Sequence, residues 1–157
     1  MLAPAASSIR KAVPMFWVVD MRATVRWYES IGFTVDDRFE DDGELVFARL
    51  SLGNGEFALS PGGTSGPRDV RLWFFTDRIE ELYEPLKLRQ LRAAQAAPST
   101  DSGDEHDVLF DEELYEPFYG GRQFSIRDNN GLSLIFWQPQ WLSPPAGPTP
   151  GDEAGGS

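Results

Sequence analysis

Hydrophobic and polar positions along the chain mark two copies of one order of elements. In the first copy, the apolar run 13–19 predicts a buried strand. Asp20 follows as the predicted N-cap of a helix, whose apolar residues recur at helical spacing and which should end by Gly32. Three strand-like runs come next, at 33–39, 45–52 and 56–60. The first copy therefore predicts the order β-α-β-β-β.

Turn residues separate these strands. Asp41-Asp42-Gly43 divides the first two, and Asn54-Gly55 is placed between the second and third. Asn-Gly favours a type I′ hairpin turn, because that turn needs a positive φ at both of its central residues. The segment 61–67 is rich in Pro, Gly and Ser, which is typical of a linker.

The second copy repeats the order with an insertion. A strand is predicted at 70–76, Asp77 is the predicted N-cap, and the next helix has the apolar face Ile79, Leu82, Tyr83 and Leu86. A short strand at 108–110 is followed by a hairpin of 123–127 and 132–137 around Asn130-Gly131. Asp20 to Gly55 spans 35 positions and Asp77 to Gly131 spans 54, so the second copy carries about nineteen extra residues. Most of them fall in 93–107, which we expect to be a mobile insertion.

Such a repeat predicts an α+β fold, in which two β-α-β-β-β modules form a curved mixed sheet around a central cavity with the helices outside. The expected organisation is a flexible N-terminus at 1–11, a single domain at 12–140 with modules 12–62 and 68–140, and a disordered tail at 141–157.

Charge and composition narrow the classes of partner. A formal charge of −11 and a pI near 4.4 disfavour nucleic acid and anionic membranes, and fit a cationic small molecule better. The chain has no Cys, no apolar stretch of membrane-spanning length and no signal-peptide pattern at its start, so a cytoplasmic location is expected. Five Trp and eleven Phe supply flat surfaces that suit a planar ligand.

Several motifs within 12–139 carry a resemblance to a known superfamily. They are Ala12-Val13-Pro14, Trp27-Tyr28, Ile31-Gly32-Phe33, Glu40-Asp41-Asp42, Glu80-Glu81-Leu82-Tyr83, Tyr119-Gly120-Gly121-Arg122, and the run from Gln123 to Asp128 that leads to Asn130-Gly131. The chain resembles the vicinal oxygen chelate superfamily of glyoxalases, extradiol dioxygenases, fosfomycin-inactivating enzymes and bleomycin resistance proteins, and is most similar to the bleomycin resistance branch. Asn129 stands where the family usually has Pro.

Metal-dependent members hold their ion with one residue on each of the first, third, fifth and eighth strands. Register counting places Val13, Arg49, Arg71 and Ile135 at those positions, and none of the four is a ligand for a divalent ion. The only His, His106, lies in the acidic insertion and is expected to be solvated. We therefore predict no metal, no cofactor and no catalytic residue.

Strand alternation predicts which residues face the cavity together with those four positions. The set comprises Met15, Trp17, Phe47, Arg49, Arg71, Trp73, Phe75, Ile135 and Trp137. The predicted ligand-binding residues are Trp17, Phe39, Phe47, Arg49, Arg71, Trp73, Phe75, Tyr119, Arg122, Phe124 and Trp137. The same aromatics could instead fill a ligand-free core. Arg49 and Arg71 each need a partner, either a carboxylate such as Glu44 or Glu56 or an anionic group of the ligand.

Three functions stay open. The first is a non-catalytic protein of the bleomycin-resistance type, which as a homodimer sequesters an aromatic or glycopeptide-like ligand, including a cationic antibiotic, in a groove. The second is a metal-dependent glyoxalase-like or dioxygenase-like enzyme with non-standard ligands. The third is a degenerate dimerisation module with a filled core.

Overall fold

The computed structural model describes residues 3–95 and 108–142, which divide into two compact units. Of the described residues, unit 1 contains 3–68 and the turn Asp128–Leu132, and unit 2 contains 69–95, 108–127 and 133–142. A short 3₁₀ helix, η1 (Ala3–Ser8), precedes the first strand. No helix in the described part of the chain combines the length and apolar character needed to cross a membrane.

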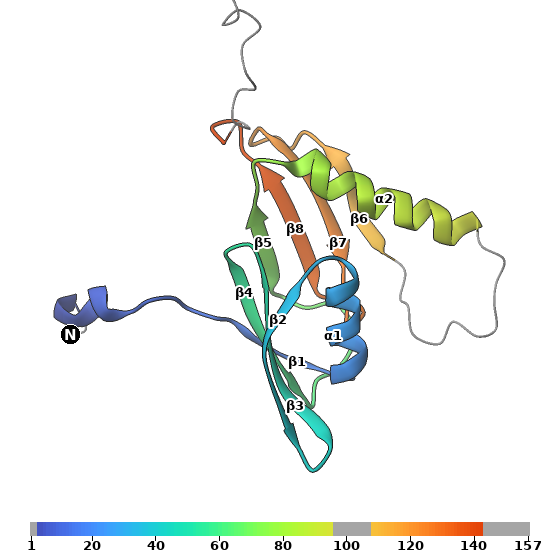
Figure 1. Ribbon diagram of the computed structural model, residues 1–157. Helices are drawn as coiled ribbons and strands as arrows, with labels where there is room; N and C mark the ends of the chain where they lie inside the picture. Colours follow the sequence, from blue (N-terminus) through green and yellow to red (C-terminus); the bar gives the residue numbers. More distant parts are fainter. Residues whose placement is uncertain (1–2, 96–107, 143–157) are drawn as a thin grey trace, which may run out of the picture. The chain divides into compact units, whose positions relative to one another are not determined.

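Besides η1, unit 1 contains one α-helix and a four-stranded mixed sheet (Figure 1). The elements are β1 (Met15–Val18), α1 (Met21–Ser30), β2 (Thr34–Asp41), β3 (Glu44–Leu52) and β4 (Gly55–Pro61). The strand order is β1-β4-β3-β2, in which β1 runs parallel to β4 and the other pairs are antiparallel. Helix α1 is part of the connection that leads from β1 to β4, since two parallel neighbours in a sheet require a crossover connection.

Helix α1 begins as predicted and covers one face of this sheet. The Asp20 carboxylate accepts the Ala23 N–H at 2.9 Å, which satisfies one of the free donors of the first turn. On the buried side, the fully buried Tyr28 ring packs edge-on against Trp27, Phe33 and Phe57 with centroid separations of 4.8–5.0 Å. These aromatic contacts form the core of unit 1.

Unit 2 repeats the same architecture. Its elements are β5 (Arg71–Phe75), α2 (Ile79–Gln95), β6 (Leu109–Tyr115), β7 (Arg122–Arg127) and β8 (Ser133–Gln138), with strand order β5-β8-β7-β6 (Figure 1). β5 is parallel to β8, and the remaining pairs are antiparallel. The core beneath α2 includes Phe124, whose ring contacts Tyr83, Phe110 and Phe136.

The turn between β7 and β8 packs in unit 1. Asp128 is 6% exposed, and its carboxylate accepts the Tyr28 hydroxyl at 2.6 Å and the N–H groups of Asn130 and Leu132 at 2.8 Å each. Thr24 Oγ1 accepts from the Asn130 side chain at 2.9 Å. Burial, followed by the Asp128 charge, raises the pKa of Tyr28 well above its usual value.

The α+β fold of two β-α-β-β-β modules is confirmed. Hydrogen bonding between strands is confined to each module, so the mixed sheet consists of two four-stranded sheets. β6 continues to Tyr115, five residues beyond the predicted strand end at Phe110. Of the predicted insertion, 93–95 lie in the last turn of α2, while 96–107, with His106, lie outside the described residues, as does the predicted tail from 143 onward.

The turns at the two Asn-Gly pairs differ from the expected type I′ geometry. The hairpin between β3 and β4 turns at Gly53-Asn54, because Leu52 pairs with Gly55, and only Gly53 has a positive φ (58°) among the turn residues. At the second hairpin only Gly131 has a positive φ, so neither turn is type I′.

Asp77 is also not the cap of α2, which begins at Ile79. The Ile79 N–H donates to Gln138 Oε1 at 3.0 Å, and the Arg78 N–H donates to Thr76 Oγ1 at 3.0 Å. The helix start is therefore satisfied by a side chain from β8, a partner that local sequence does not reveal.

Candidate ligand-binding face

Each sheet has one face covered by its helix and a second face that we call the open face. The structure places all nine residues of the predicted alternation set on the open sides, where every one is exposed or half-buried. Their strand neighbours Phe16, Ala48, Leu134 and Phe136 are buried on the helix side. The period-two pattern therefore assigned the faces correctly.

The open face of unit 1 combines aromatic residues with a charged group. Trp17 on β1 is 56% exposed, and Phe39 on β2 pairs across the strands with Phe47 on β3. Next to them, Arg49 on β3 donates to the carboxylates of Asp37 and Glu56. The charge of Arg49 is thus balanced within unit 1. Glu56 was one of the two carboxylates predicted as its partner, whereas Asp37 was not predicted.

Glu56 is shared between two cations. Its Oε2 accepts Lys11 Nζ at 2.5 Å while Oε1 accepts from Arg49. The hydrogen bonds from Lys11 and then from Arg49 lower the pKa of Glu56. This arrangement makes Arg49 a structural residue of the sheet, because both of its strong partners belong to neighbouring strands.

The open face of unit 2 is ordered in rows across its four strands. One row is Trp73, Ile135, Ser125 and Glu112; the next is Phe75, Trp137, Gln123 and Tyr115. The β5–β8 half is therefore aromatic, and the β7–β6 half is polar. Since neighbouring strands lie about 4.8 Å apart, the two halves are within reach of one small molecule.

The aromatic half forms one cluster of four rings, Trp73, Phe75, Tyr119 and Trp137, which we call the aromatic cluster. Trp73 and Trp137 stack at a centroid distance of 5.2 Å and an interplanar angle of 29°. Phe75 and Tyr119 pack edge-on against Trp137 at 5.1 and 5.5 Å. Trp73 and Phe75 remain 52% and 50% exposed, so the cluster presents flat apolar surface outward.

The polar half is centred on a carboxylate, and we call it the Glu112 network. Glu112 accepts hydrogen bonds from Gln123 Nε2 (3.1 Å), Ser125 Oγ (3.2 Å) and the Tyr115 hydroxyl (3.1 Å). Tyr119 also donates to Gln123 Oε1, which links the network to the aromatic cluster. Among the described residues, Glu112 has no cationic partner.

The sequence analysis did not predict this network, because none of its predicted ligand-binding residues lies on β6. A register shift between Phe110 and Glu112 interrupts the alternation of β6, so Phe110 contacts Phe124 on the helix side while Glu112 lies opposite Ser125 on the other face. No local pattern in the sequence marks that shift. Burial, then the Glu112 hydrogen bond, raises the pKa of Tyr115, so Tyr115 stays protonated and continues to donate at neutral pH.

Arg122 and Phe124 do not join this face. Phe124 packs on the α2 side of the sheet, because it alternates with Gln123 and Ser125, which belong to the other face and are themselves only 3% exposed. Arg122 lies at the start of β7 and pairs with Glu80 of α2. Arg71, by contrast, is exposed on the open face at the start of β5 and forms no ion pair within the described residues.

The four residues that register counting matched to the metal-ligand positions of the superfamily lie on β3, β5 and β8 or just before β1. Arg49, Arg71 and Ile135 lie on open faces, and Val13 precedes β1 by two residues. Across residues 3–95 and 108–142, no group of three His, Asp or Glu side chains is arranged to hold a metal ion.

Comparison with known proteins yields matches to solved structures. No protein-family model and no curated protein matches the chain. A glyoxylase/bleomycin resistance protein/dioxygenase domain from Frankia sp. EAN1pec aligns at 20% identity with a TM-score of 0.58, over 84% of this chain and 98% of that one. A bleomycin-binding protein complexed with bleomycin aligns at 20% identity and TM-score 0.55, over 83% and 98% of the two chains.

A fosfomycin resistance protein, FosX from Listeria monocytogenes, aligns at 11% identity and TM-score 0.56, over 83% of this chain and 93% of that chain. Ligand-binding proteins and enzyme-related domains thus share the architecture, so fold similarity alone does not assign an activity. With two β-α-β-β-β units and these structural matches, the chain has the fold of the vicinal oxygen chelate superfamily.

Proposed function

We propose that this protein binds a planar aromatic small molecule on the open face of unit 2 and sequesters it without chemical change. The observation that carries the proposal is the stacked pair Trp73 and Trp137, in which Trp73 is 52% exposed, bordered by Phe75 and Tyr119. Exposed rings held in fixed orientations give contact area at low entropic cost, which favours the stacking of a flat ligand.

The polar half of the face supports a cationic ligand. Glu112 is held by three neutral donors and lacks a cation, so its charge remains available to a ligand group. The two-strand separation places it roughly 10 Å across the sheet from Trp137. A ligand with a ring system and a positively charged substituent would satisfy both halves, as expected for a cationic antibiotic. The similarity to a bleomycin-binding protein supports this class.

Absence of catalysis is part of the proposal, together with a homodimeric state and a cytoplasmic location. The support for a non-catalytic role is chemical: register counting assigns Val13, Arg49, Arg71 and Ile135 to the positions where metal-dependent members of the superfamily carry ligands, and none of these four side chains is a ligand for a divalent ion. The competing metal-dependent enzyme is tested by elemental analysis of purified protein, where a stoichiometric divalent ion would reject the non-catalytic proposal. Sedimentation velocity would test the homodimer.

Ligand binding is tested by quenching of intrinsic Trp fluorescence during titration with bleomycin and with a panel of planar aromatic cations. Trp73→Ala and Trp137→Ala should each weaken binding about 10- to 100-fold, a loss of ~1.4–2.8 kcal/mol. Leu88→Ala is the matched control, since Leu88 is a similarly exposed apolar residue on α2. No saturable quenching by any member of the panel, or equal losses in all three variants, would reject the proposal.

A further inference from the structure

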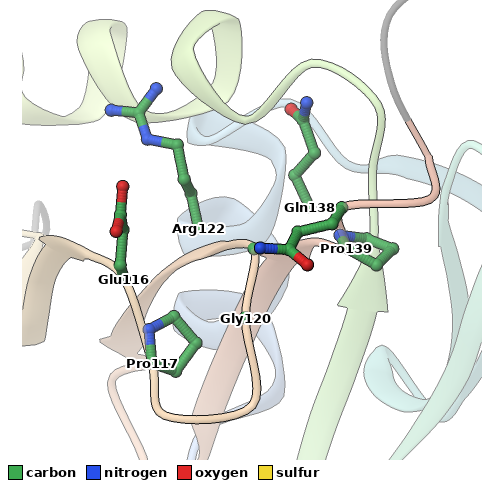
Figure 2. A pocket seen from close by; sticks show the side chains of 8 residues that line it. Glu116, Pro117, Gly120, Arg122, Gln138 and Pro139 are labelled. Atoms are coloured by element: carbon green, nitrogen blue, oxygen red, sulfur yellow. The ribbon is translucent and has the colours of Figure 1, made fainter.

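A pocket of about 310 Å³ lies where β7 begins and β8 ends, and none of the four rings of the aromatic cluster lines it. The loop Glu116–Gly121 forms one wall, and the segment Gln138–Gln140 forms the other (Figure 2). Arg122 and Gln138 occupy paired positions on the two strands and belong to the helix side of the sheet. All of these residues lie in unit 2.

The backbone of the loop wall is fixed. Gly120 N–H donates to the Pro117 carbonyl at 2.9 Å, and Trp137 Nε1–H donates to the Gly120 carbonyl at 2.9 Å. Gly121 has φ of 76°, and a Cβ there would lie 2.3 Å from the Gln138 carbonyl oxygen. Only glycine fits this approach, so the sequence Gly120-Gly121 maintains the shape of the pocket.

The lining carries both signs of charge. Glu116 is exposed and makes no ion pair within the described part of the chain. Arg122 uses Nη1 for Glu80, which leaves the other nitrogens of its guanidinium free to donate. Gln138 uses its Oε1 for the Ile79 N–H, so its amide nitrogen is also left to donate. The pocket thus offers one carboxylate and two donor groups fixed by their other contacts.

We propose that this pocket binds a small zwitterion of the α-amino-acid class, with its ammonium group at Glu116 and its carboxylate at Arg122 and Gln138. A guanidinium recognises a carboxylate through paired N–H donors, and an ammonium requires acceptors only. A volume at the lower end of the roughly 300–1,000 Å³ typical of ligand pockets suits a small molecule. The only apolar side chains of the lining are those of Pro117 and Pro139, which favours a ligand with a small side chain.

The test is saturation-transfer difference NMR of the full chain with three probes: L-alanine, L-alaninamide and N-acetyl-L-alanine. The two derivatives each lack one of the two charges. Saturable transfer to alanine is expected, with binding at least ten-fold weaker for either derivative. Glu116→Gln and Arg122→Gln should each weaken alanine binding at least ten-fold. Glu84→Gln on the exposed side of α2 is the matched control and should change nothing.

Equal binding of all three probes, no saturable transfer to alanine, or wild-type binding by Glu116→Gln would overturn the zwitterion site. Trp73→Ala should leave alanine binding unchanged, because Trp73 does not line this pocket. Failure of the aromatic-ligand proposal would therefore leave this inference intact, and the reverse also holds.

Discussion

Replacing Tyr28 by Phe removes one hydroxyl from the buried contact between α1 and the β7–β8 turn. Tyr28 is fully buried and Asp128 is 6% exposed, so the hydroxyl cannot be replaced freely by water. Its 2.6 Å bond to Asp128 Oδ2 is charge-assisted, and such bonds contribute about 1.5–3 kcal/mol. The carboxylate would keep only the N–H groups of Asn130 and Leu132. We expect the variant to lose ~2 kcal/mol of unfolding free energy.

Urea unfolding followed by circular dichroism measures this loss. With a urea dependence of roughly 2 kcal/mol per molar, the midpoint should fall by about 1 M. Tyr83→Phe is the matched control, since Tyr83 donates to Glu113 at 2.5 Å on the surface and Glu113 keeps its ion pair with Lys87. That variant should lose less than ~1 kcal/mol. Equal midpoints for the two variants, or an unchanged midpoint for Tyr28→Phe, would refute the reasoning.

Three further changes have defined outcomes. Gly121→Ala should destabilise the protein by ~1–3 kcal/mol and shift the indole N–H signal of Trp137 in ¹⁵N-resolved NMR, because a Cβ would lie 2.7 Å from Trp137 Nε1. Phe124→Ala should lower the unfolding free energy by ~3–5 kcal/mol in chemical denaturation, as expected for a core ring. Hydrogen bonds lower the pKa of Glu56 in the folded state, so its ionised carboxylate stabilises the fold above the ordinary pKa of 4.5. This stabilisation is lost as the pH falls through the lowered pKa of the folded state. When unfolding free energy is measured against pH in the acid range, Glu56→Gln should therefore lose less stability than wild type.

Element type and strand faces could be predicted from the sequence because both depend on local periodicity. The alternation that placed Trp73, Phe75 and Trp137 on one face needs no knowledge of distant residues. Glu112 was missed because β6 is an edge strand with acidic residues on it, and such a run has the composition of a loop.

Turn positions and helix caps were less predictable, since they depend on register and tertiary partners. Gly53-Asn54-Gly55 offers two adjacent sites for a turn, and the pairing of Leu52 with Gly55 selects the first. The start of α2 is determined by Gln138, which lies 59 positions from Ile79 in the sequence. The partners of Arg49 likewise follow from strand pairing, because Asp37 lies directly opposite it on β2.

The most direct test of the proposed binding face is a titration of ¹⁵N-labelled protein with bleomycin, followed through the indole N–H signals of its five Trp residues. Trp73 and Trp137 should shift saturably, whereas Trp27, which is 3% exposed in the core of unit 1, should not. A titration in which the Trp73 and Trp137 signals stay fixed at saturating ligand, or move no more than that of Trp27, would contradict the account.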